Sequence, residues 1–479
     1  MAAMSARKMS IRADYAAVAL QDPAQSPLRV RVYPRRWLIL AIYMLFSTSN
    51  LWQWIQYAIV GNLVRKYYDV SSYAVDWTSV LFMLVYIPFV YPASSLINEK
   101  GLRLSILLGA ALNAAATWLK VLAVAPGRFW LLLVAQSIAA VAQVFVLTVP
   151  PTVAFLWFGA NEVSTACALG VFGNQLGVSL SFFLTPLLIT DHENVEDIGW
   201  DMKVYSYSLA GGSTLVLLLV IAFFQDKPAT PPSVAVAVRE MSASKQGEAG
   251  GGSSLAVLRR LLRCPPFLLL VASLSLCFIV FNAVGTMLNP LILLYFQNGE
   301  AFAGRVGLLF VVSGTAGGLV CGFILDKTHK FKHTSVVLVV ILLVSMVAFT
   351  FTLSLGNHAV VYVVSLCLGF SSGGYFPVGM EFVSELTYPE PESIAMAVMM
   401  IAVQAASSAA TVLYGWMLGA VGDLWANAFL SALLLVALLV TVFIREDLRR
   451  RHVSLAANAP DRKDTEDARK SSFKVDGHH

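Results

Sequence analysis

The chain has 479 residues, of which 58% are hydrophobic and 13% are charged, whereas about 25% are charged in a typical soluble domain. A helix of about 20 apolar residues is long enough to cross the hydrocarbon layer of a bilayer. This composition excludes a soluble globular fold and predicts a protein in the lipid bilayer. The net charge of +5 comes from basic residues that flank the spans, and it indicates no nucleic-acid partner.

Candidate spans follow one another along the chain and fall into two sets of six. They begin near Trp37, Trp77, Leu102, Phe129, Val163, Val204, Pro265, Gly304, Thr334, Ala359, Ser393 and Leu424. We therefore expect an all-α integral membrane protein with two six-helix bundles around a central cavity. The predicted parts are an N-terminal tail (1–36), an N-terminal bundle (37–225), a linker (226–264), a C-terminal bundle (265–446) and a C-terminal tail (447–479).

Basic residues gather in alternate short loops, for example Arg35 and Arg36 before the first span and Lys330 after the eighth. Short loops rich in Lys and Arg stay in the cytoplasm, which predicts cytoplasmic termini and a cytoplasmic linker. No apolar segment precedes Trp37, so we expect no cleaved signal peptide. We expect the plasma membrane, with an organelle membrane (mitochondrion or endoplasmic reticulum) as the alternative.

The first span carries an unusual polar and aromatic cluster that includes Asn50, Trp52, Gln53, Trp54 and Gln56. Polar side chains at bilayer depth are costly unless they face the protein interior or a water-filled path. The alternative is that the two tryptophans belong to an interfacial aromatic belt. The depth of the cluster within the span favours a substrate-lining role.

Other spans contain amides in apolar surroundings. Asn174 and Gln175 lie between glycines in span five, Asn282 lies in span seven and Gln404 lies among small residues in span eleven. Each amide could line a site, or it could hydrogen-bond to a neighbouring helix and hold the bundle together. Both interpretations stay open for Asn174, and the site is favoured for Gln175.

Several kinds of chemistry find no support in the sequence. We locate no Asp or Glu at the middle of a span, which disfavours a proton relay, and no GxxxxGK[ST] loop for ATP. All seven histidines fall in predicted loops or tails, and the five cysteines have no CxxC spacing, so we expect no metal and no cofactor. No catalytic grouping appears, and we predict that the protein is not an enzyme. A neutral, aromatic site suits a small organic cation with a diffuse charge.

The cytoplasmic turns after spans two and eight resemble each other. Residues 96–103 and 324–330 both place a polar or acidic residue before cations. This repeat and the six-plus-six arrangement resemble the major facilitator superfamily, whose bundles rock about a central site. Asp326, Lys327 and Arg103 are the candidate residues of a conformational latch, and ordinary cytoplasmic charge is the alternative for Lys327.

Short motifs along most of the chain also resemble the feline leukaemia virus subgroup C receptor family. They lie at 34–37, 53–57, 100–103, 142–145, 163–168, 173–177 and 303–308. The resemblance implies a facilitative transporter of choline or ethanolamine that works by alternating access. Two alternatives are a haem exporter with the same fold and a membrane receptor that transports nothing.

The resemblance also implies which residues bind the substrate. The site tryptophan of the family falls on Trp54, and its two glutamines fall on Gln175 and Gln404. The chain departs from the family at Asn282, which stands beside Phe281 where the family has a tyrosine. Because an asparagine can accept hydrogen bonds from an amine, this departure favours ethanolamine.

Overall fold

The computed structural model describes residues 31–159, 162–232, 236, 254–328, 330–387 and 392–444. Most of the predicted tails and linker lie outside the described residues. Within these ranges, twelve helices are long and apolar enough to cross a membrane. They are α2 (Arg35–Ile55), α4 (Ser72–Lys100), α5 (Leu102–Ala123), α6 (Phe129–Thr148), α8 (Val163–Leu188), α9 (Val195–Phe223), α12 (Pro265–Leu293), α13 (Glu300–Thr328), α14 (Phe331–Thr352), α15 (His358–Thr387), α16 (Glu392–Ala420) and α17 (Asp423–Phe443).

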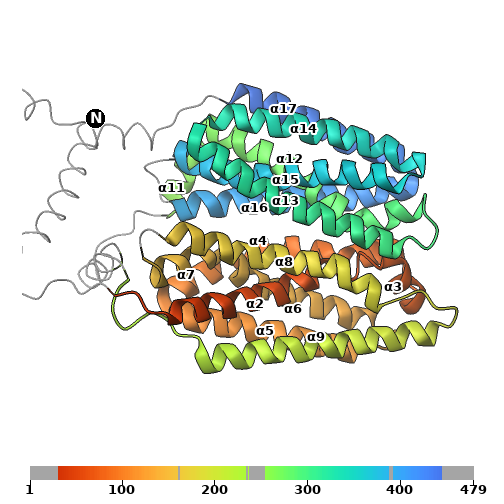
Figure 1. Ribbon diagram of the computed structural model, residues 1–479, viewed down its shortest axis with the longest axis horizontal. Coiled ribbons are helices and arrows are strands. Elements are labelled where there is room, and N and C mark those ends of the chain that lie inside the picture. The colour runs from red at the N-terminus through yellow and green to blue at the C-terminus, as the bar shows by residue number, and fades with distance from the viewer. Residues whose placement is uncertain are drawn as a thin grey trace, which may run out of the picture.

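The helices form two bundles that lie side by side (Figure 1), as the sequence predicts. Helices α2 to α9 make one bundle and α12 to α17 make the other. The short helices α3 (Gly61–Tyr68) and α11 (Ser254–Leu261) lie at opposite ends of the long axes. The charge pattern of the sequence predicts that the α11 end faces the cytoplasm. Helix α11 belongs to the predicted linker and packs against α16.

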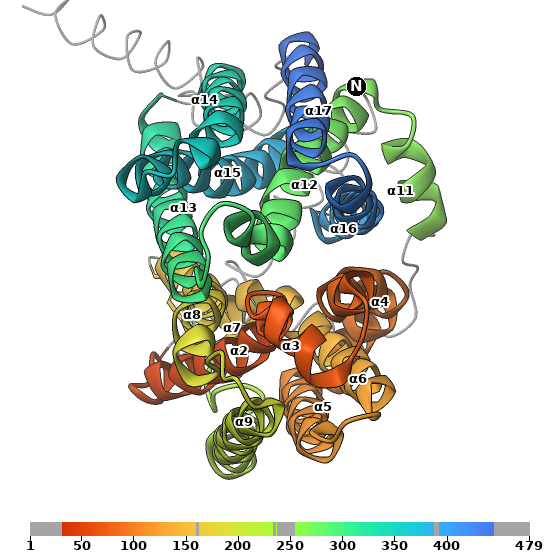
Figure 2. The same cartoon turned by 90° about the vertical axis from the view of Figure 1, so that its right-hand side faces the viewer.

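Two helix pairs dominate the contact between the bundles. Helix α8 packs against α13, and α4 packs against α16, and the view along the bundles shows both pairs at the interface (Figure 2). The first pair approaches closely because α13 carries glycine where it meets Phe182. A Cβ added at Gly307 would lie 2.2 Å from the Phe182 ring, so a larger residue would force the bundles apart there.

The bundles also meet at the α3 end. Asn62 of α3 donates a hydrogen bond from Nδ2 to Glu300 Oε1 of α13 at 2.7 Å. The carboxylate of Asp76 on α4 lies beside Gly415 of α16, where an added Cβ would be 3.1 Å away. These contacts join the bundles at the end that the charge pattern assigns to the outside.

The first span differs from the sequence prediction. The sequence predicts that the whole polar cluster, including Gln56, lies within the first span, but α2 ends at Ile55 and the chain passes through turns at 56–60 before α3 begins. Non-helical backbone at membrane depth is tolerated where it is buried in protein, and residues 56–60 are all buried. The break begins after Ile55, the residue that follows Trp54, so it lies beside the candidate site.

Candidate substrate site at the bundle interface

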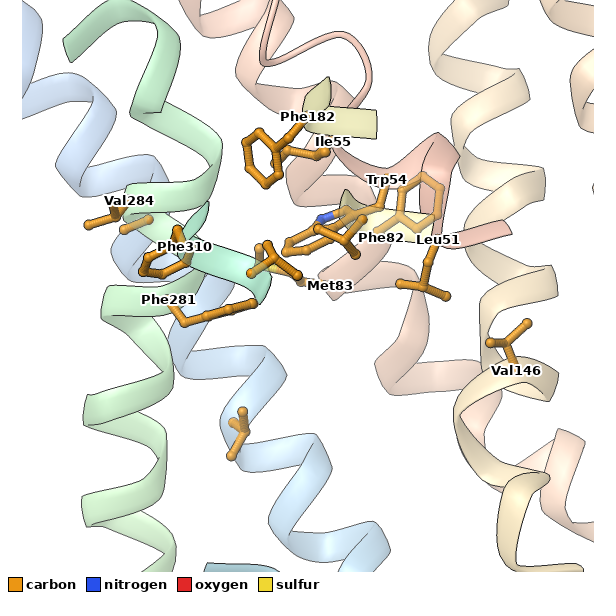
Figure 3. Close-up of a cluster of buried hydrophobic side chains, with 14 of the residues drawn as sticks. Leu51, Trp54, Ile55, Phe82, Met83, Val146, Phe182, Phe281, Val284 and Phe310 are labelled. Carbon is orange, nitrogen blue, oxygen red and sulfur yellow. The ribbon is translucent and has the colours of Figure 1, made fainter. Parts of the chain in front are cut away.

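The Trp54 side chain extends from the N-terminal bundle and contacts the C-terminal bundle. Its ring stacks on Phe281 of α12, with centroids 6.5 Å apart and an interplanar angle of 20°. Phe281 stacks in turn on Phe310 of α13 at 5.2 Å and on Phe278 at 5.4 Å. The close-up of this cluster shows side chains from both bundles around the indole (Figure 3). The structure thus brings together two predicted site residues, Trp54 and Phe281, from spans one and seven.

The indole of Trp54 has an unused donor. Its Nε1 is buried and makes no hydrogen bond within the described residues. The same holds for the Oδ1 atom of Asn174 and for the Oε1 atom of Gln143 on α6. Buried polar groups are normally satisfied, so this donor beside an aromatic face is available for a hydrogen bond to a ligand that carries both a cation and a hydroxyl group.

Helical spacing places Gln175 on the face of α8 that meets the C-terminal bundle. Gly173 and Gly177 meet the α2 backbone, where added Cβ atoms would lie 3.1 Å from Met44 Cα and 3.0 Å from Thr48 Cα. A residue two positions from each glycine lies on the opposite side of the helix. Gln175 therefore shares the face of Phe182, which meets α13, and its side chain is half-buried.

Gln404 and Asn282 lie along the contact between α16 and α12. Asn282 donates from Nδ2 to the Phe278 carbonyl at 3.0 Å and to Ser407 Oγ at 3.3 Å. Ser407 stands one turn from Gln404 on the same face of α16, and Gln404 is buried. Because a carbonyl only accepts hydrogen bonds, the Phe278 contact fixes the orientation of the amide and leaves Asn282 Oδ1 as an acceptor.

Asn50 and Gln53 face a different way. Asn50 donates to Asn113 Oδ1 at 3.0 Å and to the Ala139 carbonyl at 2.9 Å, and Gln53 donates to the same Asn113 oxygen at 2.8 Å. Both side chains are fully buried. The structure does not bring them to the bundle interface, because their amide groups hydrogen-bond to α5 and α6 of their own bundle.

A lysine that the sequence analysis did not consider lies in this same polar cluster. Lys120 of α5 is 1% exposed, and its Nζ donates to Gln53 Oε1 at 2.8 Å and lies 5.7 Å from the centre of the Tyr57 ring. A cation inside a span is a functional candidate by default. Lys120 lies in the last turn of α5, where a lysine in the sequence resembles an ordinary residue that flanks a span.

Two of the three predicted latch residues, Arg103 and Lys327, have described side-chain contacts. The backbone N–H of Arg103 donates to Asp226 Oδ1 at 3.0 Å, and its guanidinium donates to the Ile221 carbonyl at 3.5 Å. The ammonium group of Lys327 lies 4.4 Å from the centre of the Phe323 ring. The side chain of Asp326 lies outside the described residues. Arg103 therefore contacts α9 of its own bundle and the first residue of the predicted linker, and Lys327 contacts a ring of its own helix. The latch stays a prediction.

Comparison with known proteins identifies the family. The model of the Major Facilitator Superfamily matches residues 37–411. The chain belongs to this superfamily. It is therefore a membrane transporter by family, as the resemblance in the sequence implied.

Within the superfamily, the chain belongs to the feline leukaemia virus subgroup C receptor family. It is 43% identical to the zebrafish (Danio rerio) choline/ethanolamine transporter flvcr2a over 422 residues, which cover 88% of each chain. It is 38% identical to the human choline/ethanolamine transporter FLVCR2 over 422 residues, which cover 88% of this chain and 79% of the relative. The sequence prediction of this family is confirmed.

Solved structures support the fold. The xylose transporter XylE of E. coli, in a partially occluded inward-open conformation, superimposes with a TM-score of 0.69 at 12% identity, covering 86% of this chain and 99% of the other. A bacterial homologue of the lysosomal transporter Spinster superimposes with a TM-score of 0.63 at 14% identity, covering 86% and 95%. The predicted facilitator fold is confirmed.

Proposed function

We propose that this protein carries choline or ethanolamine across the plasma membrane by facilitated alternating access, with both termini in the cytoplasm. The observation that carries the proposal is the stacked pair of Trp54 and Phe281, which come from opposite bundles. An ammonium group over an aromatic face gains about 0.5–2 kcal/mol. Relatives named as choline/ethanolamine transporters share most of the length of this chain.

The remaining groups match the other end of these substrates. Choline and ethanolamine share a hydroxyethyl arm, whose oxygen can accept the free indole hydrogen bond of Trp54. The half-buried Gln175 lies on the face of α8 that meets the opposite bundle, and the buried Gln404 lies on the face of α16 that meets α12 of its own bundle. We assign these two glutamines to the hydroxyl end of the ligand, with Asn174 as a further polar contact, and we assign Asn282, beside Phe281, to the ammonium end. Asn50 and Gln53 then have a supporting role, because their hydrogen bonds inside the N-terminal bundle hold the end of α2 that carries Trp54.

The test is uptake of radiolabelled choline and ethanolamine by cells that express the protein, compared with empty-vector cells and with Trp54→Ala at matched surface expression. We expect saturable uptake of at least one amine and a loss of affinity in the variant. A haem analogue in a parallel experiment tests the haem exporter alternative, which gains no support from the described contacts of the site. Uptake of neither amine would overturn the proposal.

A further inference from the structure

The break in the first span leaves two backbone carbonyls, those of Gln53 and Trp54, without helical partners. In a continuous helix the Trp54 carbonyl would accept a hydrogen bond from the Ala58 N–H. Here the Ala58 N–H donates to the Ile55 carbonyl at 3.1 Å, as does the Ile59 N–H at 3.2 Å. An unsatisfied carbonyl at membrane depth is costly, so the end of α2 needs other donors.

Two side chains from other helices supply these donors. Ser79 of α4 donates from Oγ to the Trp54 carbonyl at 3.2 Å. Gln136 of α6 donates from Nε2 to the Gln53 carbonyl at 3.2 Å and to the Thr78 carbonyl at 2.9 Å. Both side chains are fully buried. Gln136 thus joins the end of α2 to α4 with a single amide.

The side chain before Trp54 is held just as firmly. The Oε1 atom of Gln53 accepts from Lys120, and its Nε2 donates to Asn113 Oδ1 at 2.8 Å and to the Ser49 carbonyl at 3.1 Å. Both ends of the Gln53 amide are therefore occupied. The backbone and the side chain of the residue next to Trp54 cannot turn without breaking several buried hydrogen bonds.

We propose that Gln136 and Ser79 are positioning residues, which fix the broken end of α2 so that the Trp54 indole faces Phe281 and the substrate. This inference rests on the proposed function, because it assigns the two side chains to the affinity for the amine. Neither residue touches the ligand. They act through the backbone of residues 53 and 54, and their effect must therefore depend on the indole.

The test is a double-mutant cycle measured by equilibrium binding of labelled ethanolamine and choline to the purified full-length protein in lipid nanodiscs. Gln136→Met and Ser79→Ala each remove the donors and are combined with Trp54→Ala. Each single variant should weaken binding about two- to tenfold, as the loss of one buried hydrogen bond predicts. In the Trp54→Ala background the same changes should have little further effect, because the group that they position is gone.

Ser137→Ala is the matched control. Ser137 neighbours Gln136 on α6, and within the part of the chain that the structure describes its side chain bonds only to the Leu133 carbonyl of its own helix, at 2.9 Å. Its loss should leave binding unchanged. If Gln136→Met fails to fold, Ser79→Ala carries the cycle alone, because it removes a single oxygen atom.

Two results would overturn the inference while the proposed function stands: unchanged affinity in both single variants, or equal losses with and without the indole. Equal losses would mean that these residues only stabilise the bundle. A parent protein that binds neither amine would overturn the proposed function and the inference together.

Discussion

Trp54 and Phe281 stack across the boundary between the two bundles, with ring centroids 6.5 Å apart and planes inclined by 20°. One ring moves with α2 and the other with α12, so rocking of the bundles must change their separation. A ligand between or beside these rings therefore experiences a different site in each conformation. Such a difference in affinity is what allows a ligand to shift a conformational equilibrium.

The indole should dominate the affinity for the cation. We expect Trp54→Ala to weaken binding about two- to thirtyfold, which corresponds to the ~0.5–2 kcal/mol of one cation–π contact. Trp54→Phe should keep part of the affinity, because a smaller aromatic face remains. Competition binding with choline and ethanolamine at matched expression measures both variants. Unchanged affinity in Trp54→Ala would show that the aromatic contact does not hold the amine.

Asn282 should set the choice between the two amines. Its free Oδ1 can accept a hydrogen bond from the N–H groups of ethanolamine, whereas the methylated nitrogen of choline has none to donate. We expect Asn282→Tyr to shift the preference towards choline by about two- to tenfold, since it exchanges one hydrogen bond for an aromatic face. The ratio of the two inhibition constants is the measurement. Ser407→Ala, which removes one of the two hydrogen bonds from the Asn282 amide, tests whether the orientation of that amide matters.

The hydrogen bond between Asn62 and Glu300 should hold the outer end of the bundles together. Asn62→Ala removes this hydrogen bond. A loss of about 1 kcal/mol should raise the population of the outward-open state about fivefold relative to the closed outer end. Spin labels at positions 195 and 355, in a background without cysteine, report the distance between the outer end of α9 and the short 3-10 helix that follows α14 (Leu353–Leu355).

Tyr295→Phe is the control for this experiment, because Tyr295 bonds to Asp423 within the C-terminal bundle at the same end. Its distance distribution should match that of the parent protein. An unchanged distribution in Asn62→Ala would show that the Asn62 contact does not keep the bundles closed.

Asp326 should control the rate more than the affinity. If its carboxylate forms part of a cytoplasmic latch, Asp326→Asn changes the balance between inward and outward states and alters turnover more than binding. Exchange and net uptake of the labelled amine, measured beside Lys327→Gln, separate the acid from its neighbour. Normal turnover in a well-expressed Asp326→Asn variant would remove Asp326 from the latch.

Composition and periodicity alone predicted most of the architecture. Runs of apolar residues indicated twelve spans in two sets, because a segment with so few charges is stable only in lipid. Charge in alternate loops predicted the orientation, and short motifs identified the family. The candidate role of Trp54 also came from the sequence, because an indole and several amides deep within a span are costly unless they face the protein interior or a water-filled path.

The tertiary structure decided which way each of these side chains faces. Asn50, Gln53 and Trp54 lie within five residues, yet two face α5 and α6 while the third faces Phe281. Helical spacing determines which residues share a face, but it does not determine which helix that face meets. The break after Ile55 was equally hidden, because the residues that satisfy its carbonyls, Ser79 and Gln136, lie on two other helices. Only the folded bundle brings those donors to the end of α2.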